Sequence, residues 1–591
     1  MLLKTLLWTA LVSAKCFEPS IAHPPPEYDP KDALLQDAFS EIDSALTATI
    51  DASEYASTSF SVAITSSKEL LWSRHHTARE RNTTRPDIPE VNGDALYRIA
   101  SITKAFTVLG VLYQHAAGNL SLDDPVDKYI KELRDEQEGS IPWKDITLRS
   151  LASQLSGIPR ECRRCFTLEG MPADSPPVAE RDLINLDEID PTMLGLPPVS
   201  RDGLIDCDEY SSNYDKPCTA DDLLKLLKSK APVFAPNQKS TYSNVAFEFL
   251  GVVLERVTKQ SFESYIDEAI FKPLKMLKST LSLPSDDTGV IPLEPHFWDI
   301  DQGIQSPTGG IYSSTNDLSK YLRYVLTHYN GITHAVNWFN PVSPSQDLNS
   351  FYGMPWEIFQ TDRILQDSRR TVRFITKGGS LPGYSSVVMT IPEYDLGITI
   401  LVAGSRDLLP EIKETISVVM VRAAEQLAIR QLQERYAGTY ISTNSSLNSS
   451  MTFVADHRGL VLTDFVSNST DVLNSILITS MAPKNRPWYA QLVPTLLYHE
   501  EKTQQGEEWR VLVTEQRVES KNKIWDDFCM TDVEVPLYAG LPLNEVVFWK
   551  SQESGLFESL EISAFRANLT RVEKGHNWSQ EGQEVIEMLE L

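Results

Sequence analysis

The stretch that most constrains this chain is YRIASITKAFTVLGVLYQHAAG, at positions 97–118. Its pattern predicts a short extended run followed by an amphipathic helix that opens at Ser101. Lys104 follows three positions later, so the two side chains share one helical face. A lysine held there, partly desolvated near other cations, can help to activate the serine hydroxyl as a nucleophile. Alone, however, S-x-x-K is a common pattern, and a serine at a helix start is often only an N-cap.

A second motif, TYSNVAFEFLG, places Tyr242 and Asn244 just before a predicted apolar helix. A phenol that is held partly as phenolate by two cations can act as a general base. The Asn244 amide could hold a substrate carbonyl or orient Lys104. The structural alternative is a packed tyrosine followed by a helix cap.

A third motif, TKGGSLPGYSS, places Lys377 at the edge of a predicted strand and could supply the second cation. Gly379 would let a substrate acyl group lie against the strand without a Cβ clash. The Ser380 backbone N–H could share an oxyanion hole with that of Ser101. The structural alternative is a glycine-rich hairpin with a solvated lysine.

Together, in the order S-x-x-K, Y-x-N and K-x-G, the motifs resemble the serine β-lactamase and penicillin-binding protein family. The tyrosine in the second motif is similar to the class C β-lactamase, esterase and D-aminopeptidase branch. Further segments that resemble this branch are LYRIASITKAFT, ITLRSLASQLSGIP, SPTGGIYSSTNDLSKYL, YGMPWEIF and GGSLPGYSS, within residues 45–425. The amino-terminal segment and the appended β domain resemble secreted fungal β-lactamase-like proteins.

This resemblance implies that Ser101 attacks a carbonyl and becomes acylated. Lys104 and Tyr242 would share the proton transfer, and either could be the base. Lys377 would steady charge on the phenol or on a substrate carboxylate. Substrate and oxyanion contacts are expected from Asn244, Gly379 and Ser380. No metal and no other cofactor is implied.

One departure from the family pattern concerns substrate choice. β-Lactamases carry Thr or Ser after the lysine of the third motif, whereas this chain carries Gly378. The hydroxyl that helps to bind a β-lactam carboxylate is therefore missing, and turnover of β-lactams is in doubt.

These observations predict a secreted serine hydrolase acting through an acyl-enzyme on an ester, lactone or amide, with a small-molecule or peptide-like acyl substrate. An acyltransferase of the same family is one alternative, because water exclusion decides between the two activities. A non-catalytic binding or sensor protein on the same fold is the other. The oligomeric state is left open.

The ends of the chain and its charge bear on location. Residues 1–14, MLLKTLLWTALVSA, match a secretory signal peptide, and a Pro-rich arm with the start of the first helix follows in 15–44. We expect the arm to lie across the surface. Seven N-x-S/T sequons are compatible with export, at Asn82, Asn119, Asn444, Asn448, Asn468, Asn568 and Asn577. A formal net charge of -27 argues against nucleic acid and anionic lipid as partners, and no later segment predicts a membrane span.

The six cysteines favour disulfides over other chemistry. The CRRC pair at 162–165 lacks the βαβ context of a redox motif and the second ligand pair of a zinc site. Structural bridges within a Cys-rich insert at 160–218 are therefore expected, without a defined connectivity. The cysteines are Cys16, Cys162, Cys165, Cys207, Cys218 and Cys529.

The predicted fold is α+β, with two domains after the arm. Residues 45–430 are expected to form the β-lactamase/transpeptidase-like domain that the resemblance implies, an antiparallel sheet flanked by helices plus an all-helical subdomain. Within it, the segment from Phe374 to Ser405 predicts two antiparallel strands and a connection, and DITLRSLASQLSGIP predicts a helix that ends at Gly157. In residues 431–591, short β-like runs between polar turns predict a separate antiparallel β domain of open role.

Overall fold

The computed structural model describes residues 21–134, 139–160, 217–228, 230–293, 296–444, 446–475, 487–516, 537–551 and 554–572, with Gly195, Pro197, Ile478 and Val533. The predicted signal peptide, most of the Cys-rich insert and every cysteine except Cys218 lie outside these residues. The chain divides into two compact units. The sheet unit contains Tyr28–Thr361 and Arg373–Val419, and the barrel unit contains the described parts of Met1–Glu27, Asp362–Val372 and Met420–Leu591.

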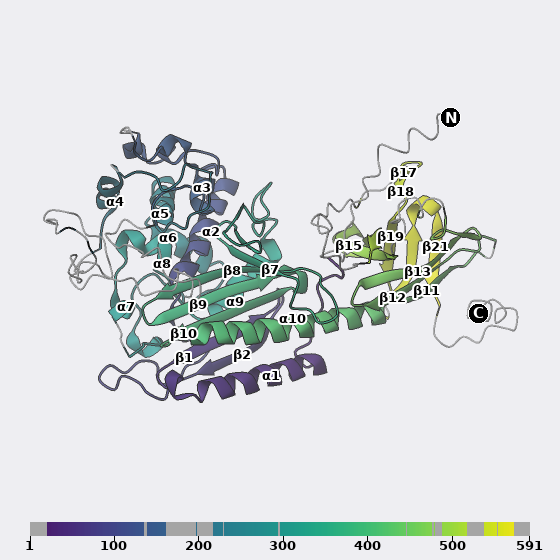
Figure 1. The fold of residues 1–591 in the computed structure, drawn as a ribbon, viewed down its shortest axis with the longest axis horizontal. Coiled ribbons are helices and arrows are strands. Elements are labelled where there is room, and N and C mark those ends of the chain that lie inside the picture. Colours follow the sequence, from purple (N-terminus) through teal and green to yellow (C-terminus); the bar gives the residue numbers. More distant parts are fainter. Residues whose placement is uncertain are drawn as a thin grey trace. The chain divides into compact units, whose positions relative to one another are not determined.

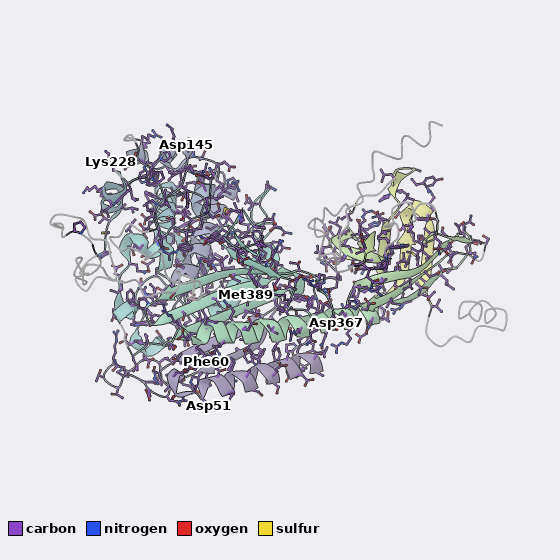
Figure 2. All side chains as sticks on the ribbon, in the orientation of Figure 1. Asp51, Phe60, Asp145, Lys228, Asp367 and Met389 are labelled. Atoms are coloured by element: carbon purple, nitrogen blue, oxygen red, sulfur yellow. The ribbon has the colours of Figure 1, made fainter. Side chains whose placement is uncertain are left out.

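The sheet unit is built on an eight-stranded sheet in the order β2-β1-β10-β9-β8-β7-β6-β5 (Figure 1). Every residue of β1, β9 and β10 is buried, so both faces of this part of the sheet are covered. Phe60 on β1 and Met389 on β9 belong to this buried set (Figure 2). The strands are β1 (Ser59–Thr65), β2 (Leu70–His76), β5 (Ser343–Pro344), β6 (Ser350–Tyr352), β7 (Glu357–Thr361), β8 (Val372–Leu381), β9 (Tyr384–Ile391) and β10 (Leu396–Ala403), with β3 (Tyr97–Arg98) and β4 (Tyr312–Ser313) pairing separately.

The pairing of β1 with β2 and β10, and of β9 with β8 and β10, is antiparallel. The predicted α+β class with an antiparallel sheet flanked by helices is therefore confirmed. The prediction of two strands for the segment from Phe374 to Ser405 was wrong, because β8, β9 and β10 are three strands. The turns between these strands are short, so the sequence pattern shows no clear break between β8, β9 and β10. One turn is at Gly383, with a φ of 83°, and the other is at Asp395, with a φ of 50°.

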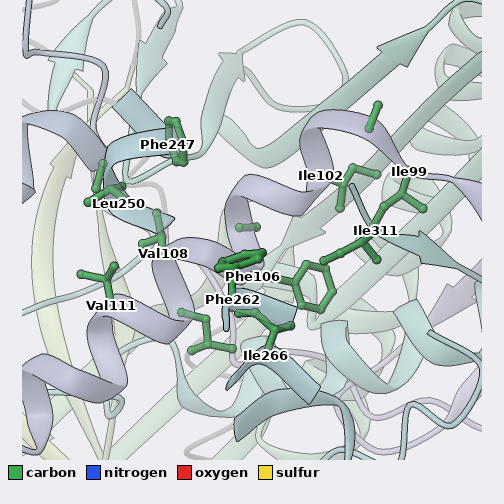
Figure 3. Close-up of a cluster of buried hydrophobic side chains, with 14 of the residues drawn as sticks. Ile99, Ile102, Phe106, Val108, Val111, Phe247, Leu250, Phe262, Ile266 and Ile311 are labelled. Atoms are coloured by element: carbon green, nitrogen blue, oxygen red, sulfur yellow. The ribbon is translucent and has the colours of Figure 1, made fainter. Parts of the chain in front are cut away.

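Helices cover the sheet and surround the segment that carries the first motif. α9 packs against β1 and β10, while the Phe39 ring of α1 stacks on Trp72 of β2 with centroids 6.0 Å apart. α2 packs against α5, α6 and α8 through apolar side chains that include Phe106 and Phe247 (Figure 3). The helices of this unit are α1 (Ala33–Ile50), α2 (Thr103–Ala116), α3 (Leu148–Ala152), α4 (Ala220–Leu227), α5 (Val245–Thr258), α6 (Phe262–Ile266), α7 (His296–Asp299), α8 (Ser306–Gly309) and α9 (Thr315–His328).

The barrel unit has a more defined architecture than the antiparallel β domain that the sequence predicted. Its nine-stranded sheet has the order β12-β11-β21-β20-β19-β16-β15-β13-β14, and β12 also pairs with β13, so eight of the strands close into a barrel. Aromatic rings that include Trp509 and Phe548 fill the interior, together with Tyr436, which follows α10 (Leu408–Arg435). The strands are β11 (Gly438–Ser442), β12 (Ser450–Asp456), β13 (Gly459–Ser467), β14 (Thr470–Asp471), β15 (Trp488–Glu500), β16 (Gln505–Glu515), β19 (Glu545–Lys550), β20 (Phe557–Ile562) and β21 (Ala567–Arg571), beside the small hairpin of β17 (Leu537–Tyr538) and β18 (Leu541–Pro542).

The described part of the amino-terminal arm is exposed at several positions, as expected of a segment on the surface, but other residues of the arm are inserted into the protein. Ala22 and His23 are almost fully buried in the barrel unit. His23 Nε2 lies 3.0 Å from the Glu425 carboxylate, which also accepts a hydrogen bond from the buried guanidinium of Arg370. His23 can be buried because its imidazole and Arg370 together satisfy a carboxylate that would otherwise be costly to bury. The positions of the arm that stay exposed include Pro25, Glu27 and Asp29.

No helix in the described part of the chain combines the length and apolarity needed to cross a bilayer.

This buried cluster predicts a specific acid sensitivity. Burial raises the pKa of Glu425, but the hydrogen bond from His23 and the charge of Arg370 outweigh burial and lower that pKa from 4.5 to about 2. The native state therefore binds fewer protons than the unfolded state between these two values, so stability is lost as pH falls from about 4.5 towards 2. The contribution at neutral pH is about 3 kcal/mol.

We expect Glu425→Gln to be less stable than wild type at pH 6, because it leaves the Arg370 charge buried without its counter-ion. The gap should narrow at pH 3, because the carboxyl is then protonated in the unfolded wild-type chain but still largely ionised in the folded one. Urea unfolding at both pH values measures it, with Glu434→Gln, an exposed residue of the same helix, as the matched control. A gap that does not change with pH would contradict this account.

Candidate active site

Ser101 lies in a 3₁₀ turn, Ala100–Ile102, directly before α2. The helix was predicted to open at Ser101, but α2 begins two residues later, at Thr103. Ala100 has a φ of 46°, a left-handed conformation that is strained for a residue with a Cβ. The turn leaves the Ser101 side chain half-buried while its neighbours on both sides are packed inside.

Lys104 occupies the first turn of α2 and is fully buried. Its Nζ donates to Ser101 Oγ at 2.9 Å and to the Thr308 carbonyl oxygen at 3.0 Å. The ammonium group is thereby fixed against the nucleophile by a carbonyl that comes from a different helix, α8.

Close packing holds α8 in the place that this contact needs. The Thr107 hydroxyl donates to the Pro307 carbonyl at 2.7 Å. A Cβ on Gly251 of α5 would lie 2.2 Å from Pro307 Cγ, so only glycine lets these helices approach so closely. Sequence reasoning singled out neither Thr308 nor Gly251 as part of the site.

Tyr242 reaches the nucleophile from the loop before α5, and its hydroxyl donates to Ser101 Oγ at 3.1 Å. Gln154 holds this loop on both sides of the tyrosine, because its carbonyl accepts from Thr241 N at 2.9 Å and its Oε1 accepts from Ser243 N at 2.7 Å. These bonds explain why the helix expected to run to Gly157 ends instead with α3 at Ala152: Gln154 adopts a φ of 61° to make them.

Three cations surround the Tyr242 ring. The Nζ atoms of Lys104 and Lys377 lie 5.2 Å and 5.5 Å from its centroid, and the Arg160 guanidinium lies 4.6 Å away. Burial raises the pKa of Tyr242, but the charges of Lys104 and Lys377 outweigh it, so the pKa is lowered from 10.0. The phenol is therefore easier to ionise than a tyrosine in water.

Lys377 is buried on β8 and pairs with a residue that sequence reasoning missed. Its Nζ donates to Glu357 Oε1 at 2.6 Å and to the Gly378 carbonyl at 2.8 Å. Burial lowers the pKa of Lys377, but the charges of Glu357 and Tyr242 raise it by a larger amount. The net shift of the pKa is therefore upward, and the side chain stays protonated. Glu357 lies in the segment YGMPWEIF, which supported the family resemblance, but no role was assigned to it, since one glutamate on a strand is usually solvated.

The remaining predicted residues lie around this centre. A Cβ on Gly379 would lie 3.0 Å from Ser101 N and 2.2 Å from the Ile99 carbonyl, so β8 passes directly against the nucleophile turn. Ser380 follows in register opposite Ser385 of β9 and is half-buried. Asn244 is anchored by its backbone N–H, which donates to the Arg160 carbonyl at 2.8 Å. The structure thus brings Ser101, Lys104, Tyr242 and Lys377 together and places Asn244, Gly379 and Ser380 on adjoining segments.

Among the described residues, no group of three or more His, Cys, Asp or Glu side chains is placed to hold a metal ion. What the arrangement offers is a serine hydroxyl that accepts hydrogen bonds from an ammonium group and from an acidified phenol. Such a constellation can transfer a proton from a serine as it attacks a carbonyl.

Comparison with known proteins agrees with these observations. The family described as Beta-lactamase matches residues 38–416, and the family described as Beta-lactamase-like-like, C-terminal domain matches residues 428–573. The protein named Probable hydrolase clz13, from Cochliobolus lunatus, is 31% identical over 583 residues, covering 95% of this chain and 92% of that protein. A Beta-lactamase-like protein from Arthroderma benhamiae is 27% identical over 575 residues, covering 89% and 90%.

Among solved structures, a class C β-lactamase aligns with 67% of this chain and 98% of its own, at 15% identity and a TM-score of 0.45. The first family covers well over half of the sequence, and the hydrolase relative aligns over nearly all of it. The chain therefore belongs to the β-lactamase family and carries the C-terminal domain of β-lactamase-like proteins.

Proposed function

We propose that this protein is a serine hydrolase that cleaves an ester, lactone or amide through an acyl-enzyme on Ser101. The observation that carries the proposal is that Ser101 Oγ accepts from both Lys104 Nζ, at 2.9 Å, and Tyr242 OH, at 3.1 Å. A hydroxyl with one such neighbour could be structural. Two titratable donors on one half-buried serine, with further cations behind them, fit an activated nucleophile.

In the proposed mechanism Tyr242 is the base. Its lowered pKa suits it to accept the Ser101 proton, and Lys104 and Lys377 stabilise the phenolate. As the Oγ–C bond forms, the carbonyl oxygen becomes an oxyanion, which the backbone N–H groups of Ser101 and Ser380 would hold.

When the leaving group departs, the C–O or C–N bond breaks and the leaving atom takes the proton from Tyr242. Water then attacks the acyl carbon and gives a proton to the Tyr242 phenolate. The bond between Ser101 Oγ and the acyl carbon breaks, the acid is released, and Ser101 Oγ takes the proton from Tyr242. The cycle needs no cofactor and restores every charge.

We also propose export of the protein from the cell. The signal-like segment 1–14 motivates this proposal. The described sequon asparagines are compatible with glycan attachment, since Asn82 is half-buried and the others are exposed, namely Asn119, Asn444, Asn448, Asn468 and Asn568. Protein recovered from the medium of expressing cells should lose mass on treatment with a peptide N-glycosidase; absence from the medium would contradict export.

The nucleophile is tested by covalent labelling. A fluorophosphonate should add once per molecule, at Ser101, and Ser101→Ala should abolish the adduct and lower ester turnover by about 10³-fold or more, because nucleophile and base act as a unit. Intact-mass spectrometry with peptide mapping measures the adduct, with the exposed Ser40→Ala as the matched control. Undiminished turnover by folded Ser101→Ala would overturn the proposed function.

The base is tested by its pH dependence. Turnover should rise with pH as Tyr242 ionises, and Tyr242→Phe should lower kcat/KM by about 10²- to 10⁴-fold. Lys377→Met should move the acid limb of the pH–rate profile to higher pH, since removal of a nearby cation raises the pKa of Tyr242. The limb position does not depend on how much enzyme folds. Exposed Lys68→Met is the control, and equal profiles for both lysine variants would rule out Tyr242 as the titrating base.

A further inference from the structure

The carboxylate of Glu357 lies beside the site, where it is hydrogen-bonded to Lys377 and Gly378 and not to Ser101. Glu357 begins β7, which neighbours β8 in the sheet. Its Oε1 accepts from Lys377 Nζ at 2.6 Å, and its Oε2 accepts from Gly378 N at 2.9 Å. The backbone also fixes its position, because the Thr376 hydroxyl donates to the Glu357 carbonyl at 2.7 Å. Both carboxylate oxygens are thus tied to β8, next to the residue that touches the nucleophile turn.

Burial shows which side of this ion pair a ligand would meet. The Lys377 side chain is 1% exposed, whereas that of Glu357 is 36% exposed. The cation is therefore screened from outside, while the carboxylate faces solvent. A group that approaches this ion pair from solvent meets the carboxylate before it meets the lysine.

Glycine at position 378 belongs to the same arrangement. A Cβ there would lie 3.3 Å from Glu357 Oε2, so any side chain would crowd the carboxylate. Gly378 leaves that space to Glu357, and it offers no hydroxyl to a ligand. At this edge of the site the chain therefore presents the Glu357 carboxylate, a hydrogen-bond acceptor, and no side-chain hydroxyl that could donate to a ligand.

The net negative charge of the whole chain also disfavours an anionic substrate, but its effect at the site is weaker than that of Glu357. The net charge of -27 repels anions, yet its effect is screened over about 8 Å at physiological ionic strength. Glu357 acts within hydrogen-bonding distance of β8 and so dominates the discrimination. The opposing group is Arg160, whose guanidinium lies on the Tyr242 ring and could attract an anion.

We propose that Glu357 is a specificity-determining residue that directs the site to substrates uncharged beside the scissile carbonyl and discriminates against substrates that carry a carboxylate there. The inference rests on the proposed hydrolase function and defines its substrate class. Glu357 acts by occupying Lys377 and by presenting its own negative charge, so it takes part in substrate choice and not in bond making.

The test compares 3-acetoxybenzoate with its methyl ester, two aryl acetates that share the scissile bond and differ in one charge. Wild type should hydrolyse the methyl ester with a kcat/KM at least about 10-fold higher, and Glu357→Gln should bring the ratio near one by raising kcat/KM for the carboxylate. The ratio cancels any change in the pKa of Tyr242, which affects both esters alike. Glu132→Gln, which removes a carboxylate from a surface pair with Arg256, is the matched control and should keep the wild-type ratio.

Several outcomes would overturn the inference. A wild-type preference for the carboxylate would assign recognition to Arg160, and an unchanged ratio in Glu357→Gln would remove Glu357 from substrate choice. If that variant does not fold, the wild-type ratio alone still decides the direction of the preference. Wild type that accepts a fluorophosphonate on Ser101 but reacts with neither ester also contradicts the inference, whereas failure of that labelling would contradict the hydrolase function itself.

Discussion

The ammonium group of Lys104 is fully buried, and it donates to the Ser101 hydroxyl and to the Thr308 carbonyl. A cation in an apolar interior is costly unless its hydrogen bonds are satisfied, so this contact constrains its surroundings. α8 must bring a carbonyl to it, which explains the close approach of Pro307 to Gly251. The helix core around α2 therefore serves the position of one charge as much as it serves stability.

The balance of charge around Tyr242 follows from the same constraint. Burial disfavours a phenolate, and only nearby cations can reverse that effect. Lys104 acts from the helix and Lys377 from the sheet, so the phenol is acidified where the two layers meet. Glu357 opposes this effect in part, since its charge raises the pKa of Tyr242 while it keeps Lys377 protonated. Base strength and substrate choice are thus adjusted through the same carboxylate.

Three local motifs, taken together with the family resemblance, predicted the residues that the structure brings together, and each of these residues sits in a short motif with its own backbone requirement. Ser101 and Lys104 are one helical turn apart, and Gly379 must lack a Cβ to pass the nucleophile turn. Glu357 and Gln154 could not be found in this way. The role of Glu357 arises because β7 pairs beside β8. The role of Gln154 arises because this residue, in a left-handed conformation, binds a loop at least 87 positions away. No local periodicity encodes either feature. The barrel closure was missed for the same reason, since β12 pairs with both β11 and β13.

The contrast between global and local charge explains why composition alone said little about the chemistry. The chain carries 81 acidic and 54 basic side chains, yet three cations lie within 5.5 Å of one phenol ring. Screening limits the remote acidic groups, whereas buried charges at short range interact strongly. An acidic protein can therefore maintain a cationic site that favours a phenolate. Within that site the only described acidic side chain hydrogen-bonded to Lys377 is Glu357, so the charge near Lys377 depends on one exposed carboxylate set against the guanidinium of Arg160.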